Sequence, residues 1–472
     1  MILPAEVREL IEALGRENEA LRAQNAVLLA KVAELRRRLD LDSSNSSKPP
    51  SSDGLKKKRR VLKSLRKSTG KRSGGQKGHR GDTLRQVAEP DLIIEHAAER
   101  CAHCQARLSA DSKIGEEKRQ VFDLPEKPLI VTEHRAAIHD CPACNQRTRA
   151  DFPEGVVSPA QYGERLRAAG VYLNAQQLVP EERTAQVLAD LFGAAAACGA
   201  SVAAWVRRKA EALAPLYRRI GACVAAAPVR CLDETGFRIA GTTRWLHTAS
   251  TPTHTFYRAD EPRSAMPELA GGVVVHDHWR AYLSLENVDH AFCNAHLLRE
   301  LQAVCEFDKE PWAEALRATL LDANEAVRTA KAQGETALAP ETIKAFEERY
   351  WAAVREGLAL HRSLPAFDPS TNPKKRKKQR PAHNLLIRFK SFKEATLRFL
   401  ADFAVPFTNN LAEQDLRMMK VKTKISGGFR TPQGADDFAR LRSVISSARK
   451  HGFNISKALA LAPERLAADL KL

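Results

Sequence analysis

The chain has 472 residues and a formal net charge of +18. This length exceeds what one compact core usually holds, so several domains are expected, and the charge favours a polyanionic partner, nucleic acid ahead of an anionic membrane. No run of eighteen apolar residues occurs, and charges follow soon after Met1, so we expect no membrane-spanning helix, no signal peptide and a cytoplasmic, nucleoid-associated protein.

The first 40 residues carry a heptad pattern. Apolar residues recur at seven-residue spacing at Val7, Leu14, Leu21, Leu28 and Leu35. Asn18 and Asn25 occupy the complementary seam, where buried Asn pairs favour an in-register parallel dimer. The pattern predicts a coiled coil over 1–40 that joins the chain into a homodimer or a higher oligomer. The alternative is one amphipathic helix that packs on its own protein.

Residues 41–90 lose this period and are rich in Ser, Pro, Gly and cations, which predicts a flexible basic linker. Such cations neutralise phosphates without reading sequence. The candidates for this role are Lys56, Lys57, Lys58, Arg59 and Arg60, with Lys374, Lys375 and Arg376 in a second basic run at 372–381. The alternative is a solvated tail with no DNA contact.

Four cysteines form two close pairs, Cys101 with Cys104 and Cys141 with Cys144. Two such pairs make the ligand set of a tetrahedral zinc site, and the 36 residues between them offer strands to hold the pairs together. We expect residues 91–158 to form a zinc-ribbon-like module with one structural Zn²⁺. A redox pair or unpaired core cysteines are the alternatives.

Residues 159–226 are Ala-rich and predict three helices. Gly193 is placed to end the second helix and Ser201 to cap the third. This layout permits a helix-turn-helix whose last helix offers Arg207, Arg208 and Lys209 to DNA. A plain helical spacer fits equally well, because the turn between the last two helices is long for that motif.

From residue 229 the pattern changes to short β-like runs. The segments VRCLD, TRWLHTAS, THTFYRA, GGVVVHD and HAFCN predict five strands, and helical patterns follow between about 300 and 400. The sequence therefore predicts an α/β domain with a mixed sheet over 227–456, interrupted by a helical insertion. Residues 457–472 form a C-terminal tail to which no function is attached.

Three acidic residues stand where such a domain would gather them. Asp233 ends VRCLD, Asp277 ends GGVVVHD, and Glu413 lies in the first turn of a helix after Asn410. Cutting DNA without a covalent intermediate requires two divalent cations held by carboxylates. Each residue taken singly also fits a plain role, as a strand end or as a helix-capping residue.

Several further motifs occur in a fixed order, namely NSSKPPSSDG, GGQKGHRG, the CxxC pairs, LDETGF, VVHDHWRAY, CNAHLLREL, NNLAEQDLR and KISGGFR. Together with the heptads, they resemble the insertion-sequence 66 family of transposases over most of the chain. The resemblance implies a multidomain α+β protein with an RNase H-like catalytic domain. It implies that Asp233, Asp277 and Glu413 hold two Mg²⁺ or Mn²⁺ ions.

The resemblance also places His296 in a family motif, and Asn409 and Asn410 beside Glu413. Basic residues near Glu413 are candidates for DNA contacts, namely Arg417, Lys420, Lys424 and Arg430. The expected substrates are the terminal inverted repeats of the element and target DNA, with accessory proteins as further partners. Two other functions remain open, a zipper-dimerised zinc regulator without catalysis and a nuclease that cuts without joining.

Overall fold

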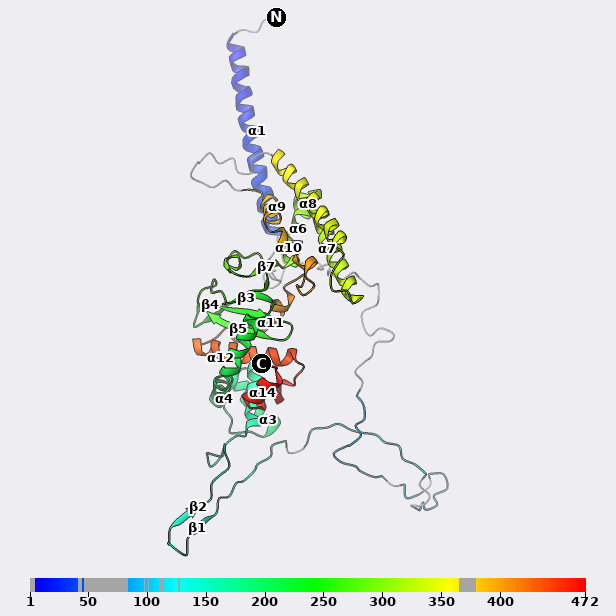
Figure 1. Cartoon of the computed structure of the whole chain (residues 1–472), viewed down its shortest axis with the longest axis vertical. Helices are drawn as coiled ribbons and strands as arrows, with labels where there is room; N and C mark the ends of the chain where they lie inside the picture. Colours follow the sequence, from blue (N-terminus) through cyan, green and yellow to red (C-terminus); the bar gives the residue numbers. More distant parts are fainter. Residues whose placement is uncertain are drawn as a thin grey trace. The chain divides into compact units, whose positions relative to one another are not determined.

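The computed structural model (Figure 1) describes residues 5–40, 45, 84–96, 98–100, 102–109, 114–125, 128–364 and 379–472. Two compact units emerge. Residues 153–189 and 195–472 belong to the first, called the sheet unit here, and residues 84–152 to the second, called the cysteine module. Some candidate residues lie outside the described residues, namely Lys56, Lys57, Lys58, Arg59, Arg60, Cys101, Lys374, Lys375 and Arg376.

Helix α1 (Ala5–Asp40) spans the heptad segment as one uninterrupted helix. Leu14, Leu21, Leu28 and Leu35 are each more than half exposed. A helix with such a stripe lowers its free energy by covering it with another apolar surface. The helix is therefore as the heptads predict, and its pairing with a second copy stays a prediction.

The sheet unit is built around a mixed, five-stranded sheet in the order β5-β4-β3-β6-β7. Its strands are β3 (Val229–Ile239), β4 (Thr242–Ser250), β5 (Thr255–Asp260), β6 (Val273–His276) and β7 (Asp289–Phe292). β3 pairs antiparallel with β4 and parallel with β6, and β6 pairs parallel with β7. The five strands expected from the sequence, and the mixed sheet, are confirmed.

A group of helices follows β7 in the chain (Figure 1). These are α6 (Asn294–Ala303), α7 (Pro311–Ala332), α8 (Pro340–Ser363), α9 (Pro381–Ser391) and α10 (Lys393–Ala401), with a π-helical turn at Val304–Asp308. Trp312, Tyr350 and Phe389 are fully buried among them and belong to the same core cluster as Val275 of the sheet. Most of the described residues between 294 and 401 are thus helical, as the sequence predicts.

The helices before the sheet are α2 (Glu164–Val171), a π-helical turn (Tyr172–Gln176), α3 (Glu181–Phe192), α4 (Gly199–Ala212) and α5 (Ala214–Ala225). Gly193 follows α3 with φ +75°, as a helix-ending glycine does. Two expectations are wrong. The third helix is really two, because Pro215 starts a new helix after Leu213. Ser201 lies inside α4, whose cap is Cys198, because Gly199 and Ala200 already belong to the helix.

The C-terminal part of the sheet unit contains α11 (Asn410–Ser426), α12 (Pro432–Lys450), α13 (Ile455–Ala460) and α14 (Pro463–Asp469). Helix α12 covers the edge strand β5: the Ser443 and Ser447 hydroxyl oxygens accept hydrogen bonds from the N–H groups of Tyr257 and Thr255, at 2.9 and 3.0 Å. Satisfying edge-strand N–H groups removes a template for aggregation. Residues 457–472 are not a loose tail, because Leu466 of α14 is fully buried.

The cysteine module has little regular structure. Strands β1 (Ile138–Asp140) and β2 (Arg147–Arg149) form a short antiparallel hairpin. Among the described residues between the cysteine pairs, the expected strands are absent except at 138–140, so that expectation is wrong for these residues. The physical reason is that side chains there are exposed, so no apolar core holds longer strands together. In the described part of the chain, no helix is long and apolar enough to cross a membrane.

Candidate active site

Asp233 and Asp277 lie on neighbouring parallel strands. The register pairs Cys231 of β3 with Val275 of β6, so each aspartate lies two residues beyond a paired residue. Because side chains alternate along a strand, the two carboxylates fall level and on the same face. Asp277 directly follows β6, as expected. Asp233 does not end its strand, because β3 continues to Ile239 through its hairpin with β4.

Glu413 comes to the same place from helix α11. The Asn409 side-chain amide donates to the backbone oxygen of Leu232, at 2.6 Å, and so holds the start of the helix beside Asp233. Leu416 and Met419 are buried in the core cluster that contains β3 residues. Asn409, rather than Asn410, is the N-cap residue of α11. Its side chain makes no capping hydrogen bond and binds Leu232 instead.

Negative charges gather around Asp233 and Asp277. Burial raises the pKa of Asp233 well above its usual value, and the negative charges of Glu234, Glu413 and Asp277 raise it further. Burial also raises the pKa of Asp277, with Glu234 and Glu413 adding to the effect. Like charges gathered in a buried place disfavour ionisation unless a cation compensates them. The negative charges of these carboxylates would therefore stabilise a cation bound among them.

Two neighbouring acids are already occupied. Glu234 accepts from Arg263 Nε at 2.9 Å and from the Tyr282 hydroxyl. Asp415 Oδ2 accepts from Ser250 and Thr255 hydroxyls at 2.6 and 2.8 Å, and from Lys450 Nζ at 3.0 Å. These partners give Glu234 and Asp415 structural tasks, which sets them apart from Glu413.

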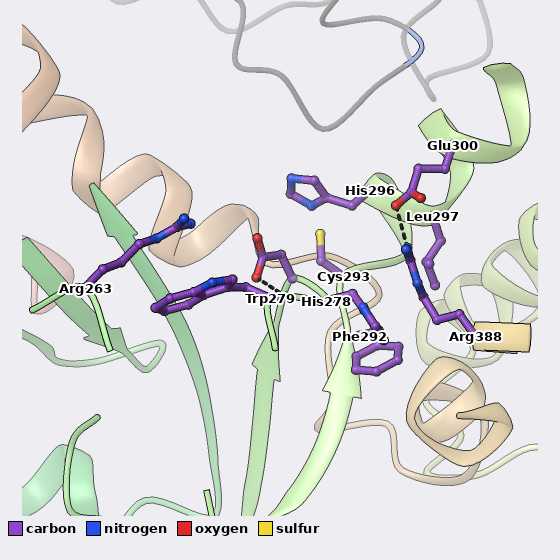
Figure 2. Close-up of a pocket in the computed structure, with 10 residues that line it drawn as sticks. Arg263, His278, Trp279, Phe292, Cys293, His296, Leu297, Glu300 and Arg388 are labelled. Atoms are coloured by element: carbon purple, nitrogen blue, oxygen red, sulfur yellow. Dashed lines mark hydrogen bonds and ion pairs between the residues drawn. The ribbon is translucent and has the colours of Figure 1, made fainter. Parts of the chain in front are cut away.

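A pocket of about 270 Å³ opens beside Asp277 (Figure 2). Its wall includes Arg263, Trp279, Cys293 and His296. The Arg263 guanidinium lies over the rings of Trp245 and Trp279, at 4.9 and 4.2 Å from their centroids. Its charge lowers the pKa of Asp277, against the larger effect of burial. The Arg263 guanidinium, which lies over two tryptophan rings, thus provides a positive charge close to Asp277.

Cys293 and His296 enter the pocket from the start of α6 (Figure 2). Their ligand atoms and a carboxylate oxygen of Glu413 lie within 4.8 Å of one another. His296 Nδ1 is 3.9 Å from Glu413 Oε1. Within the described chain, both of these atoms are buried and neither has a hydrogen-bond partner. Burial lowers the pKa of His296 to about 4 and raises that of the Cys293 thiol to about 11.

These observations test whether the residues fit divalent cations. Buried polar atoms are nearly always paired, so an unpaired Glu413 oxygen next to two aspartates is the arrangement expected of a cation ligand. Carboxylate oxygens are the ligands that Mg²⁺ and Mn²⁺ prefer. If Glu413 merely capped its helix, Oε1 would accept a backbone N–H, and no such bond exists among the residues described. The site fits the metals.

The candidate DNA-binding residues of α11 are exposed, as is Arg430 beyond the helix. Arg417, Lys420 and Lys424 follow Glu413 at spacings of four, three and four residues, which places all of them on one helix face. On α4, Arg208 is exposed, but Arg207 pairs with Glu211 at 3.0 Å and Lys209 with Glu164 at 2.7 Å. Lys209 is thus engaged within the fold.

Cys104 and the pair Cys141 and Cys144 sit in two similar turns. An antiparallel bridge joins Arg100 to Arg107 around Cys104, and β1 and β2 enclose Cys141 and Cys144 at the same spacing. The residue after each second cysteine, Gln105 or Asn145, has a positive φ, of 61° and 53°. Hydrogen bonds from the Cys144 thiol and nearby backbone lower the pKa of Cys141. Both turns therefore have the shape of a metal knuckle.

The structure does not gather the cysteines into one cluster. Cys101 lies outside the described residues, and Cys104 forms no group with Cys141 and Cys144 among the residues that are described. Zinc binding supplies the energy that folds small modules of this kind. Each turn has the shape of a zinc-binding knuckle. The binding of one Zn²⁺ by both turns together stays a prediction.

Comparison with known proteins identifies the family. Residues 159–437, more than half of the chain, match the family described as "Transposase IS66 family". The chain belongs to this family. Residues 98–145 match the "zinc-finger binding domain of transposase IS66", and residues 2–85 match a family of unknown function. The resemblance noted in the sequence is confirmed.

An uncharacterised protein of Sinorhizobium fredii, y4jD, is 25% identical over 408 residues, which cover 80% of this chain and 76% of that protein. No solved structure matches the chain. Family membership indicates an enzyme that cuts or transfers DNA, with DNA as its partner. The zinc-finger match supports structural zinc in the cysteine module.

Sequence reasoning missed several residues of the pocket, among them Arg263, Trp279 and Cys293. Arg263 lies in a loop with no motif of its own, so no local signal marks it. The spacing of Cys293 and His296 at the start of a predicted helix was a usable signal, because residues three apart share a helix face. The sequence could not show that Glu413 joins them.

Proposed function

We propose that the protein cuts DNA at the ends of a mobile element and joins them to target DNA, at a site formed by Asp233, Asp277 and Glu413. One observation carries this proposal: acids up to 180 residues apart are brought together from two neighbouring strands and a helix, where the charge of Glu413 raises the pKa of both aspartates. A structural role gives no reason to gather three carboxylates in one partly buried place. Metal-dependent phosphoryl transfer does.

Asp233, Asp277 and Glu413 would hold two Mg²⁺ or Mn²⁺ ions. When bound, the ions lower the pKa of a water or a 3′-hydroxyl and stabilise the leaving oxygen. The chain's own task is to hold its carboxylates in place. Asn409 does this for Glu413 by its bond to Leu232 of β3, and the hydrogen bond from Trp279 N–H to Asp277 Oδ1, at 3.0 Å, does it for Asp277.

The basic face of α11 gives the DNA a path to the acids. Arg417, Lys420 and Lys424 form a row that starts one helical turn from Glu413. Cations in such a row neutralise successive phosphates and bring a scissile phosphate to the carboxylates. Arg263 lies on the pocket side, where its guanidinium offsets negative charge close to Asp277.

The mixed sheet, with acids on adjacent parallel strands and on a helix behind it, supports an RNase H-like fold for residues 227–456. Helix α1 would join two copies, each bringing a cysteine module and the basic segments around Lys56 and Lys374 to DNA. In this arrangement, the terminal inverted repeats are the specific substrate and accessory proteins are further partners.

The decisive experiment incubates the purified full-length protein and Mg²⁺ with labelled element ends and scores both nicking and joining. Asp233→Asn, Asp277→Asn and Glu413→Gln should each lower both by about three orders of magnitude or more, because losing one ligand charge affects nucleophile and leaving group alike. Double replacements should be hardly worse than single ones, since the acids act as a unit.

Glu325→Gln is the matched control, because it removes one carboxylate charge from an exposed position on α7. It should leave nicking and joining unchanged. DNA binding should persist in all variants. Near-normal cleavage by Glu413→Gln would exclude Glu413 from the site. Nicking without any joined product, with known ends supplied, would instead favour a nuclease that does not join.

A further inference from the structure

A second ligand set shares Glu413 with the carboxylate site. Cys293, His296 and Glu413 offer a sulfur, a nitrogen and an oxygen within 4.8 Å of one another. Among the described residues, this is the one group of three or more potential ligand side chains at that separation. Asp233 and Asp277 lie outside it, so Glu413 stands between two sets of different chemistry.

The local structure prepares the sulfur and the nitrogen for a cation. Cys293 caps the N-terminus of α6, and the backbone N–H of Asn409 donates to its Sγ at 3.2 Å. The nearby N–H groups of Ala295 and His296 act in the same direction, against the burial that raises the pKa of this thiol. Burial still raises the pKa of the thiol overall, so a bound cation would displace its proton to form the thiolate that binds metals. Three residues on, His296 lies on the same face of the helix.

The chemistry of the set selects the ion. Thiolate and imidazole ligands suit Zn²⁺ and similar borderline cations, whereas Mg²⁺ prefers oxygen ligands only. Three protein ligands with one open position is the arrangement of zinc sites that stay in contact with solvent. Cys293 and His296 line the pocket of about 270 Å³, which leaves room for a fourth ligand.

We propose that Cys293, His296 and Glu413 bind one Zn²⁺-class ion, apart from the zinc of the cysteine module, and that this ion withdraws Glu413 from the carboxylate site. Zinc bound to the buried Oε1 of Glu413 would hold this carboxylate towards His296, whose Nδ1 lies 3.9 Å away. Zinc bound here therefore opposes Mg²⁺-dependent DNA cleavage. The binding site stands independently of the proposed function, whereas its inhibitory effect rests on it.

The binding test uses the full-length protein with its structural zinc loaded and Co²⁺ as the probe. Thiolate ligation gives Co²⁺ a charge-transfer absorption that carboxylate ligation lacks. The wild-type protein should bind one Co²⁺ equivalent more than Cys293→Ser, with this absorption. His296→Ala should weaken the same binding by at least about tenfold, since even outer ligand partners contribute that much.

Cys305→Ser is the control, because it removes another partly buried thiol outside the set. It should keep the extra equivalent. Thermal melting checks that each variant is folded, and His296→Ala, which alters a partly exposed side chain, gives a second answer if Cys293→Ser misfolds. Equal Co²⁺ binding and equal absorption by wild type, Cys293→Ser and His296→Ala would overturn the site.

The cleavage arm separates this proposal from the proposed function. Micromolar Zn²⁺ should inhibit Mg²⁺-dependent nicking by the wild type, and His296→Ala should need at least about tenfold more zinc for the same fractional inhibition. If Co²⁺ binds as expected and wild-type nicking resists zinc, the withdrawal of Glu413 is wrong. If nicking works and no extra Co²⁺ binds, the site is wrong and the proposed function stands.

Discussion

In the sheet unit, Leu316, Tyr350 and Phe389 are fully buried, whereas in the cysteine module Val121 and Ile130 are more than four-fifths exposed. The sheet unit buries enough apolar surface to hold its strands and helices without any ion. The cysteine module has a hairpin of three-residue strands and two knuckle turns. In this module, metal binding must supply the folding free energy that the burial of apolar side chains does not. Replacing a metal ligand should therefore unfold the cysteine module but leave the sheet unit folded.

The largest expected effect is on the cysteine module. Cys104→Ser should unfold this module, because zinc binding contributes about 10–16 kcal/mol to the folding of such modules. Zinc content and limited proteolysis of this segment measure the loss. Glu413→Gln is the counterpart in the sheet unit and should leave the amide protection of β3 and β6 intact. A zinc-free module that resists proteolysis like wild type would break the comparison.

The same contrast explains what sequence reasoning could reach. Local pattern was sufficient for the five strands, because alternating or continuous apolar runs such as VVVH depend only on near neighbours. It was sufficient for placing Asp277, whose strand ends at His276. It failed at Asp233, because the hairpin pairing with β4 extends β3 beyond the acid. Tertiary pairing outweighed the local signal there.

Contacts between segments far apart in the sequence were the other feature that local patterns could not predict. The pairing of Lys209 with Glu164, and of Asn409 with Leu232, joins segments that no local pattern relates. The motifs predicted that Asp233, Asp277 and Glu413 belong together, but not which acids nearby are already occupied. Ser250 and Lys450 decide that for Asp415, and Arg263 and Tyr282 for Glu234. These facts follow from packing.

A smaller effect is expected for DNA affinity. Lys420 and Lys424 lie on a rigid helix, so each should neutralise a phosphate at a fixed place, unlike the cations of a linker. Replacing both by Gln should lower the log–log salt slope of DNA binding by about 1.8, at about 0.9 per phosphate. Fluorescence anisotropy across a salt series measures this slope. The control Lys344→Gln, an exposed cation on α8, should leave it unchanged.

An unchanged slope in the double Lys420 and Lys424 variant would mean that α11 does not face DNA. The path proposed from the basic face to the acids would then be wrong, even if Glu413 proved essential. The basic linker would become the main source of phosphate contacts.

The smallest effect concerns how the core of the sheet unit depends on pH. His254 is 6% exposed, beside His451 and within reach of Lys450. Burial, with a smaller contribution from the charges of His451 and Lys450, lowers its pKa below the usual 6.5. A histidine with a depressed pKa adds stability that is complete above pH 6.5 and is lost as pH falls towards the folded-state value.

Unfolding of the sheet unit should therefore take up one proton at His254 in mildly acidic solution. The free energy of unfolding should fall below pH 6.5 by up to about 1.4 kcal/mol per pH unit from this group. Urea unfolding at a series of pH values measures the slope. His254→Asn should flatten it, and comparing slopes removes the constant cost of the substitution itself. The exposed His103 of the cysteine module provides the contrast, because His103→Asn should not change the slope for the sheet unit. If His254→Asn left that slope unaltered, the histidine would titrate alike in the folded and unfolded chains, and its burial would not oppose protonation.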